Sequence, residues 1–311
     1  MKVIPYHKGM VISQSGIYSG VPMDVYHGGK LCDGPSISSS GLRTIFNNSP
    51  AHYWDKSPYN PEREEEDQSD AFIFGRGTHH LILGEDDFST LFIMRPEEIG
   101  GKAWQGNRTE CKAWLAEQVA EGRTVLAPDD IKKIRGMAKS LARHPLVANG
   151  ILNGLVEQTL VCKDKETGVY LLSRPDCIPN DSGDYADLKS TSESGFGLDR
   201  SIQKYRYDMQ AALVGRCSRE VLDVEMTSFS FVFCEKNRPH TTDVLTLHDI
   251  DIQAADMDNK VALRVFVKCM ETGNWFGPSG TQNDARYAHL SDFKRQDADL
   301  RREFLEREIA G

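Results

Sequence analysis

The chain has 311 residues, of which 39% are hydrophobic and 27% charged, as in a globular protein with one large domain or two small ones. Its seven cysteines are dispersed and include no C-x-x-C pair, which argues against a disulfide framework, a zinc ribbon or an iron–sulfur cluster. The net charge of −9 counts against a DNA partner, but a pocket for a divalent metal is itself acidic, so composition leaves that class open.

No run of 18 apolar residues occurs, and the first residues do not resemble a secretory signal. We therefore expect a cytoplasmic protein without a membrane span. Much of the negative excess lies in Glu62–Asp70, which we expect to be a solvated loop.

The first third of the chain predicts little regular structure before its first long helix. Residues 1–30 are expected to form a loosely structured lead-in. The serines of Ser36–Arg43 precede a short helical pattern, as is typical of a helix N-terminus. A second helix is predicted within Phe72–Leu83, beginning after Gly75 or Gly77.

Two amphipathic helices are predicted next. The first covers about Arg108–Glu121 and ends at Gly122. The second begins at Pro128–Asp130, a favourable first turn, and Pro145 follows its end. Its apolar face consists of Ile131, Ile134, Met137 and Leu141.

Strand patterns dominate from residue 158 onward. The predicted order is a three-strand meander, a helix, two strands and a long helix. Their ranges are Gln158–Lys163, Val169–Ile178, Asp184–Lys189, about Leu198–Cys217, Met226–Cys234, Thr241–Leu247 and about Ile250–Thr272. This order predicts a mixed α/β fold with a central mixed β-sheet flanked by helices. A charged helix at Ser291–Ile309 is expected to be peripheral or to serve assembly.

The stretch Ser173–Lys189 carries the most informative polar residues. Asp187 and Lys189 share one face of a predicted strand, because side chains alternate along a strand, and Asp176 ends the strand before it. Two carboxylates and a backbone carbonyl suit Mg²⁺ or Mn²⁺, and a lysine can position or deprotonate a metal-bound water. By itself, however, the D-x10-D-x-K pattern more often marks turns and a solvated lysine.

Four short segments then occur in the order of a known enzyme family: GRGTHH around His79, SRPD ending at Asp176, ADLKS around Asp187–Lys189 and YRYDMQAAL around Gln210. Together they resemble PD-(D/E)XK nucleases of the group that includes the RecB exonuclease domain, lambda exonuclease and, most closely, RecE. The likeness covers about residues 20–277, including the lead-in MDVYHGG…SISSSGLRTIFNNSPAHYW. Each motif alone is weak, and four in order are specific.

The resemblance implies a metal site. His79, Asp176 and Asp187 would bind the metal, and the carbonyl of Leu188 would assist. His79 is preferred over His80 because its G-x-x-x-H spacing is that of the family. Without the resemblance, a histidine in an apolar segment is more often a packed or capping residue.

The resemblance also implies the catalytic residues. Lys189 would act on the attacking water, and Gln210 would orient that lysine or the scissile phosphate. The chain departs from the related Q-x-x-x-Y pattern because Val214 stands where tyrosine is frequent, so Tyr207 is a candidate substitute. Glu157 is a further candidate, as an outer-shell or second-metal carboxylate.

Candidate DNA contacts complete the list. Ser40 lies at a predicted helix N-terminus, where backbone N–H groups and a hydroxyl can receive a phosphate, although a plain helix cap is the alternative. Arg174 can hold a phosphate near the metals or form a surface salt bridge. Lys204 and Arg206 are candidate backbone contacts, beside the Tyr207 named above.

The resemblance implies a restriction-endonuclease-like domain at 1–277, with its core at about 72–272, a DNA-end-binding segment at about 20–60 and a charged tail at 278–311. It further implies an Mg²⁺-dependent 5′-to-3′ exonuclease that degrades linear double-stranded DNA and leaves 3′ overhangs for recombination. A RecT-like single-strand annealing protein would be its partner. A homo-oligomer, such as a ring-shaped tetramer, and a phage origin are expected on the same grounds.

Two alternatives remain open. A Cas4-like nuclease shares the His, Asp, Asp and Lys core but holds an iron–sulfur cluster through grouped cysteines, which this chain lacks. An inactive DNA-binding or assembly module is the non-enzymatic alternative, and the retention of Asp176, Asp187 and Lys189 counts against it.

Overall fold

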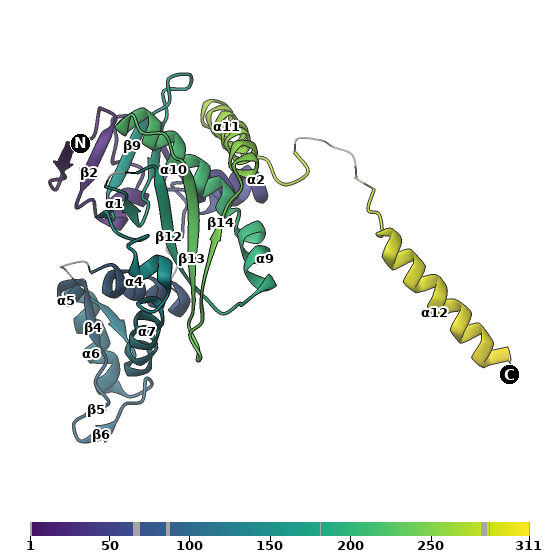
Figure 1. Ribbon diagram of the computed structural model, residues 1–311, viewed down its shortest axis with the longest axis horizontal. Coiled ribbons are helices and arrows are strands. Elements are labelled where there is room, and N and C mark those ends of the chain that lie inside the picture. The colour runs from purple at the N-terminus through teal and green to yellow at the C-terminus, as the bar shows by residue number, and fades with distance from the viewer. Residues whose placement is uncertain are drawn as a thin grey trace.

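The structure is a computed structural model that describes residues 2–64, 69–84, 88–180, 182–280, 285 and 287–310. Residues 65–68 of the predicted acidic loop lie outside this described part. The fold is a mixed α/β arrangement of several small sheets and surrounding helices, as the sequence predicts (Figure 1). Within the described residues, no helix has the length and apolar character needed to cross a bilayer.

The N-terminal residues are part of the fold, which corrects the expected loose lead-in. They supply two strands and helix α1 (Met23–His27) to one side of a five-stranded sheet. Its order is β1 (Val3–Pro5), β2 (Gly16–Ser19), β9 (Thr159–Lys163), β10 (Tyr170–Ser173) and β3 (Ser36–Ser38). Strands of three or four residues leave no clear local pattern. Here β2 is fixed by pairing with β9, more than 140 residues away in sequence, and β1 pairs with β2.

The predicted three-strand meander is only half right. β9 and β10 form the expected hairpin, but β12 (Asp184–Thr191) pairs in parallel with β13 (Ser228–Glu235). β14 (Thr242–Thr246) completes that three-stranded sheet, and β8 (Leu155–Val156) pairs with β11 (Cys177–Ile178) in a separate two-stranded sheet. The expected single central sheet is therefore divided, and each of the two larger sheets is mixed.

Helix α4 (Asp70–Leu83) begins earlier than predicted. The Ser69 side chain accepts a hydrogen bond from the Phe72 amide and caps the helix, so both glycines are internal. A Cβ at Gly77 would lie 2.9 Å from a methyl of Leu126. The glycine thus permits close helix packing rather than marking the start of the helix.

The predicted helix at 198–217 is two helices, α9 (Phe196–Tyr205) and α10 (Tyr207–Leu222). Arg206 between them adopts a left-handed conformation with φ of 50°. Its guanidinium binds Asp208 at 2.9 Å and Asp258 at 2.6 Å. These tertiary ion pairs hold a break that the apolar periodicity does not indicate.

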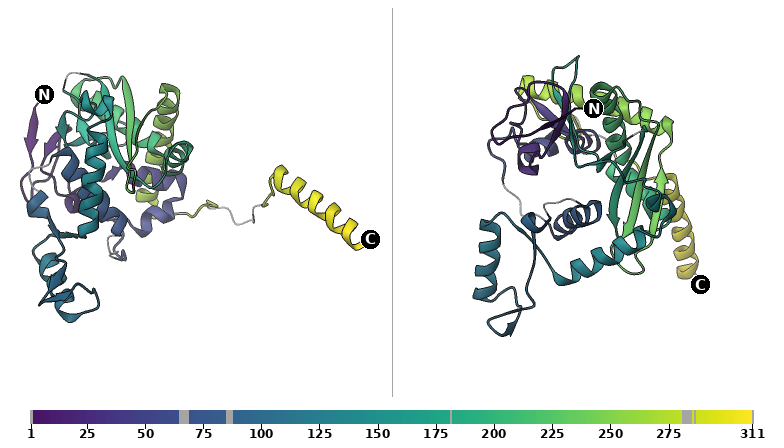
Figure 2. Two further views of the ribbon diagram at one scale, coloured as in Figure 1. Left: turned by 60° about the horizontal axis from the view of Figure 1, so that its bottom comes forward. Right: turned by 60° about the vertical axis from the view of Figure 1, so that its left-hand side comes forward.

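An insertion connects α4 to β8 and projects from the rest of the fold (Figures 1 and 2). It contains the two predicted amphipathic helices, α6 (Thr109–Ala120) and α7 (Pro128–Leu141). Its smaller elements are α5 (Phe88–Leu91), β4 (Phe92–Met94), β5 (Glu98–Ile99), β6 (Lys102–Ala103), β7 (Thr124–Leu126) and α8 (Pro145–Ala148). The predicted face of α7 is correct, since Ile134, Met137 and Leu141 are buried.

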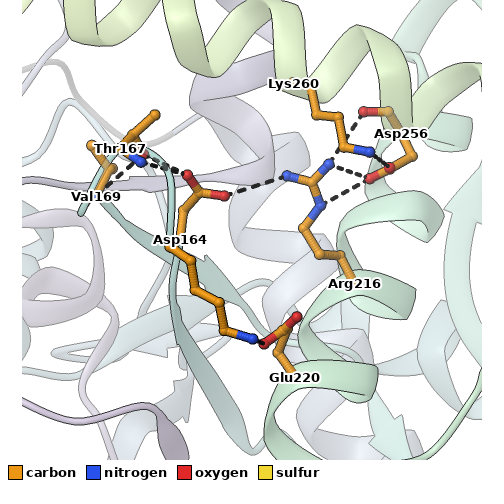
Figure 3. A network of polar contacts seen from close by, with 8 residues as sticks. Asp164, Thr167, Val169, Arg216, Glu220, Asp256 and Lys260 are labelled. Atoms are coloured by element: carbon orange, nitrogen blue, oxygen red, sulfur yellow. Dashed lines mark hydrogen bonds and ion pairs between the residues drawn. The ribbon is translucent and has the colours of Figure 1, made fainter.

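Helix α10 is held between the β9–β10 turn and α11 (Asp249–Thr272) by a polar network (Figure 3). Arg216 of α10 binds Asp256 at 2.6 Å and approaches Asp164 of the turn at 3.9 Å. Lys260 binds the same Asp256 at 2.9 Å. Short helices α2 (Ser39–Asn47) and α3 (Pro50–Asp55) pack beside α11.

The predicted C-terminal helix is present as α12 (Asp292–Ala310), which stands apart from the other elements in Figure 1. Its exposed side chains include Phe293, Leu300 and Phe304. Its role in assembly stays a prediction.

A close backbone approach at Gly154 yields a stability prediction. A Cβ there would lie 2.2 Å from the Ile178 carbonyl oxygen, so Gly154→Ala must push β8 away from β11. We expect a loss of about 1–3 kcal/mol in the free energy of unfolding, measured by urea denaturation. Gly106→Ala, where the added Cβ meets nothing within 4 Å, is the control, and equal stability of both variants would refute this packing.

Candidate active site

Strand β12 separates a functional face from an apolar face. Ala186 and Leu188 point into the core cluster that also contains Ile134 of α7 and Phe74 of α4. Tyr185 points the other way, into the core cluster that contains Phe231 of β13. Since side chains alternate, Asp187 and Lys189 share the side of Tyr185, as the sequence predicts.

Asp176 is a buried residue of the site, with only 5% of its surface exposed. One carboxylate oxygen lies 3.2 Å from Nδ1 of His79 on α4. The other accepts a 2.5 Å hydrogen bond from the Leu188 amide of β12. His80 instead packs its ring against Phe92, 4.9 Å between centroids, so the structure brings His79 and not its neighbour to Asp176.

Glu157 completes a cluster with these two residues. One donor atom from each of His79, Glu157 and Asp176 lies within 4.8 Å of the others. Glu157 sits just after β8 with φ of 51°, and its amide donates a 3.0 Å hydrogen bond to the Asp176 carbonyl. Two carboxylates and an imidazole are a donor set that suits a divalent cation, so the residues fit a metal.

Asp187 adjoins this cluster through its neighbour Leu188 but has other partners. Its Oδ1 accepts a 2.7 Å hydrogen bond from Gln210 of α10, and its Oδ2 pairs with the Lys189 ammonium. The structure therefore brings Asp187, Lys189 and Gln210 together. Metal ligation by Asp187 and by the Leu188 carbonyl stays a prediction.

The first pair of ionisable groups holds opposite charges. Burial lowers the pKa of His79, but the charge and hydrogen bond of Asp176 outweigh it and raise that pKa to about 9. Burial raises the pKa of Asp176, and the His79 charge and hydrogen bond overcome it, so the net shift is downward. Because a metal binds neutral imidazole, a cation must displace the proton of His79.

The second pair of ionisable groups is Asp187 and Lys189, and burial has the largest effect on the pKa of each. Burial and the neighbouring Asp176 charge raise the pKa of Asp187, against the effect of Lys189. For Lys189, burial lowers the pKa, but the charges of Asp187 and Asp176 prevail and raise it. The Lys189 ammonium is therefore protonated at neutral pH.

Tyr207 lies beside Lys189, and Arg43 lies beside the same tyrosine. Its ammonium lies 5.1 Å from the ring centre of Tyr207, the residue proposed to replace the family tyrosine. Val214, which stands at the position of the family tyrosine in the sequence, is buried in the core. The Arg43 guanidinium of α2 lies 5.9 Å from the centre of the Tyr207 ring and donates a 2.7 Å hydrogen bond to the Tyr205 carbonyl. Sequence reasoning missed Arg43, whose only signal is its place at the end of the serine-rich segment.

Ser40 lies apart from this cluster, in a cavity of about 320 Å³ beside the N-terminus of α2. Its hydroxyl is 2.9 Å from that of Ser38. Basic side chains line the same cavity: His27, His52, Lys56 and Arg63. This lining suits an anion, as the predicted phosphate contact requires.

The structure gives the other predicted DNA contacts intramolecular partners. Arg174 donates to Thr159 and to the Val21 carbonyl at 2.7 Å and covers the Tyr26 ring, which ties β10 to the N-terminal segment. Arg206 is engaged with two aspartates at the α9–α10 break. A DNA contact by either residue stays a prediction.

Comparison with solved structures shows a shared fold. A crystal structure of a candidate exonuclease from Eubacterium rectale matches with a TM-score of 0.50 and 14% identity, over 82% of this chain and 91% of that one. An alkaline exonuclease from Laribacter hongkongensis gives a TM-score of 0.25 and 9% identity, over 54% of this chain and 87% of the other, which is too weak to use. No curated protein matches the chain.

The family comparison covers most of the sequence. Residues 38–287 match the family described as a PDDEXK-like domain of unknown function (DUF3799). This range includes all of the residues gathered around Asp176 and Asp187. The resemblance to PD-(D/E)XK nucleases is confirmed, and the chain belongs to this PDDEXK-like family.

Proposed function

We propose that this protein is a metal-dependent exonuclease that degrades linear double-stranded DNA. One observation carries the proposal: three segments distant in sequence bring His79, Glu157 and Asp176 together, beside a lysine held by Asp187. Family membership supports a nuclease, and the fold shared with the Eubacterium rectale protein, named as an exonuclease candidate, supports an exonuclease.

The residues would divide the chemistry between binding and positioning. His79, Glu157 and Asp176 would hold Mg²⁺, with Mn²⁺ as a substitute. When bound, the metal supplies charge stabilisation and acidifies a water. Lys189 is protonated, so it can donate hydrogen bonds to the attacking water or to the scissile phosphate but is not set up to remove a proton. Asp187 pairs with Lys189 and orients it, and Gln210 holds Asp187 through a hydrogen bond.

The finer parts of the proposal follow the likeness to RecE. They are 5′-to-3′ polarity, 3′ single-stranded overhangs, recombination by annealing with a RecT-like protein, and a homo-oligomer. A cytoplasmic location is proposed as well. The cavity beside Ser40, with its basic lining, supports binding of a DNA end near α2.

Replacement of Lys189 tests the catalytic assignment. Lys189→Ala should slow nucleotide release from linear duplex in Mg²⁺ by about 10²- to 10³-fold, because the ammonium that stabilises charge in the transition state is lost. Asp187→Asn should also slow it, because the ammonium loses the carboxylate that orients it. Initial rates measure this, and circular dichroism checks the fold. Lys268→Ala, an exposed lysine on α11, is the control, and a wild-type rate in either site variant would disprove the assignment.

Replacement of Glu157 tests its place in the metal centre. Glu157→Gln should weaken Mn²⁺ binding by about 10- to 100-fold, since one charged ligand is removed. Titration calorimetry without DNA measures the affinity. Glu166→Gln, an exposed carboxylate in the β9–β10 turn, should bind as the wild type does, and an unchanged affinity in Glu157→Gln would remove Glu157 from the site.

The substrate form distinguishes an exonuclease from an endonuclease. We expect linear duplex to be degraded and covalently closed circular DNA to survive, with all digestion stopped by a chelator. A 5′-end label should appear early in mononucleotides if polarity is 5′ to 3′. Cutting of the closed circle would instead indicate an endonuclease, and early release of a 3′ label would reverse the polarity.

A further inference from the structure

The break between helices α9 and α10 brings two tyrosines into a stack. Tyr205 is the last residue of α9, and Tyr207 is the first residue of α10. Their ring centroids lie 5.6 Å apart, with an angle of 27° between the ring planes. In a continuous helix, side chains two positions apart do not face each other. The stack therefore exists because the chain changes direction at Arg206.

Arg206 holds this break in an unfavourable backbone conformation. A residue other than glycine is uncommon at a φ of 50°, and such conformations gather at functional sites. The guanidinium offsets the cost by binding Asp208 and Asp258. It also lies 5.0 Å from the ring centre of Phe46 on α2. These contacts fix the chain on both sides of Arg206, where the two tyrosines lie.

Tyr207 connects the stack to the functional face of β12. Its ring centre lies 5.1 Å from the Lys189 ammonium and 5.2 Å from the ring centroid of Phe231. Phe231 is the β13 partner of Asp187 in the sheet register, so these two side chains are on the same side of the sheet. Gln210, which donates to Asp187, follows Tyr207 by one helical turn. The stack thus begins at Lys189 itself.

Tyr205 is the outer member of the stack. Its surface is 49% exposed, whereas Tyr207 is partly buried. The Lys204 ammonium lies 5.1 Å from the centre of the Tyr205 ring, and Arg43 donates to the Tyr205 carbonyl. An exposed aromatic ring among basic side chains is how many proteins hold a DNA strand without reading its sequence. The ring stacks on a base, and the cations attract the backbone.

We propose that Tyr205 stacks on a terminal nucleobase of the DNA strand that is cut, and that Lys204 attracts the backbone of the same strand. The inference rests on the proposed nuclease function, in which Lys189 contacts the scissile phosphate. A base inside a duplex has both faces covered by its neighbours, so only a base at the end offers a free face. Every base has such a face, so the contact selects a DNA end and tolerates any sequence.

Substitution of Tyr205 tests the stack. Binding of a short duplex, labelled at an internal base, is measured by fluorescence anisotropy with metal chelated. Tyr205→Ala should bind about 5- to 100-fold more weakly than the wild type, because one base loses its stacking partner. Tyr205→Phe retains the ring and should bind as the wild type does. Wild-type affinity in Tyr205→Ala, or a loss in Tyr205→Phe as large as in Tyr205→Ala, would overturn the proposal.

Two controls separate stacking from a structural effect. Tyr205→Ala keeps the backbone carbonyl that accepts from Arg43, and Tyr207 keeps its contacts with Phe231 and Phe233, so circular dichroism and thermal unfolding should match the wild type. Tyr287→Ala removes a tyrosine that is 91% exposed and lies outside both helices, and it should leave DNA affinity unchanged. A lower kcat in Tyr205→Ala with unchanged affinity and KM would mean a structural role and overturn the proposal.

Abasic nucleotides test which base is held. They replace the first four nucleotides from each end of each strand, one at a time. One terminal position should weaken binding by the wild type and leave Tyr205→Ala unaffected, because the base and the ring form a single contact. Equal effects in both proteins at every position would contradict the proposed stacking.

Failure of the stacking contact and failure of the nuclease function are distinguishable. If the wild type digests linear duplex while Tyr205→Ala matches it in affinity and in its response to abasic positions, the stacking is wrong and the nuclease stands. If the wild type neither binds nor digests DNA, the proposed function itself fails.

Discussion

The burial of two carboxylates side by side is the constraint on which the site depends. Asp176 and Asp187 are 5% and 1% exposed, and such groups are unfavourable in a protein interior unless they are paired. Each has its own compensation: His79 and the Leu188 amide for Asp176, Lys189 and Gln210 for Asp187. Removing His79 or Lys189 leaves its buried carboxylate with one hydrogen bond and no paired charge, so the site is fixed by electrostatics as much as by shape.

The division of the strands into separate sheets serves this arrangement. β12 runs parallel to β13 and carries Asp187 and Lys189, while the short β8–β11 pair sets Glu157 against Asp176. For Gln210 to donate its hydrogen bond to Asp187, helix α10 must be held in a defined position next to β12. The ion pairs of Arg216 anchor it there, between the β9–β10 turn and α11.

In the sequence, the insertion lies between His79 and Glu157, two residues of the metal cluster. It joins α4, which carries His79, to β8, which directly precedes Glu157. Its helix α7 packs against α4 and against the turn after β13. Helix α7 thus contacts the helix that carries His79.

The sequence by itself determined the alternation that puts Asp187 and Lys189 on one face, the amphipathic face of α7, and the hairpin of β9 and β10, because these depend on local periodicity. It also indicated the family, through motifs in a fixed order. Only the tertiary structure decided that β12 pairs with β13, that residues 3–19 are strands, and that the helix at 198–217 breaks at Arg206. It alone placed Arg43 beside Tyr207 and Glu157 beside His79. Those contacts join residues tens of positions apart, so their energy appears only once the chain has folded and no local pattern records it.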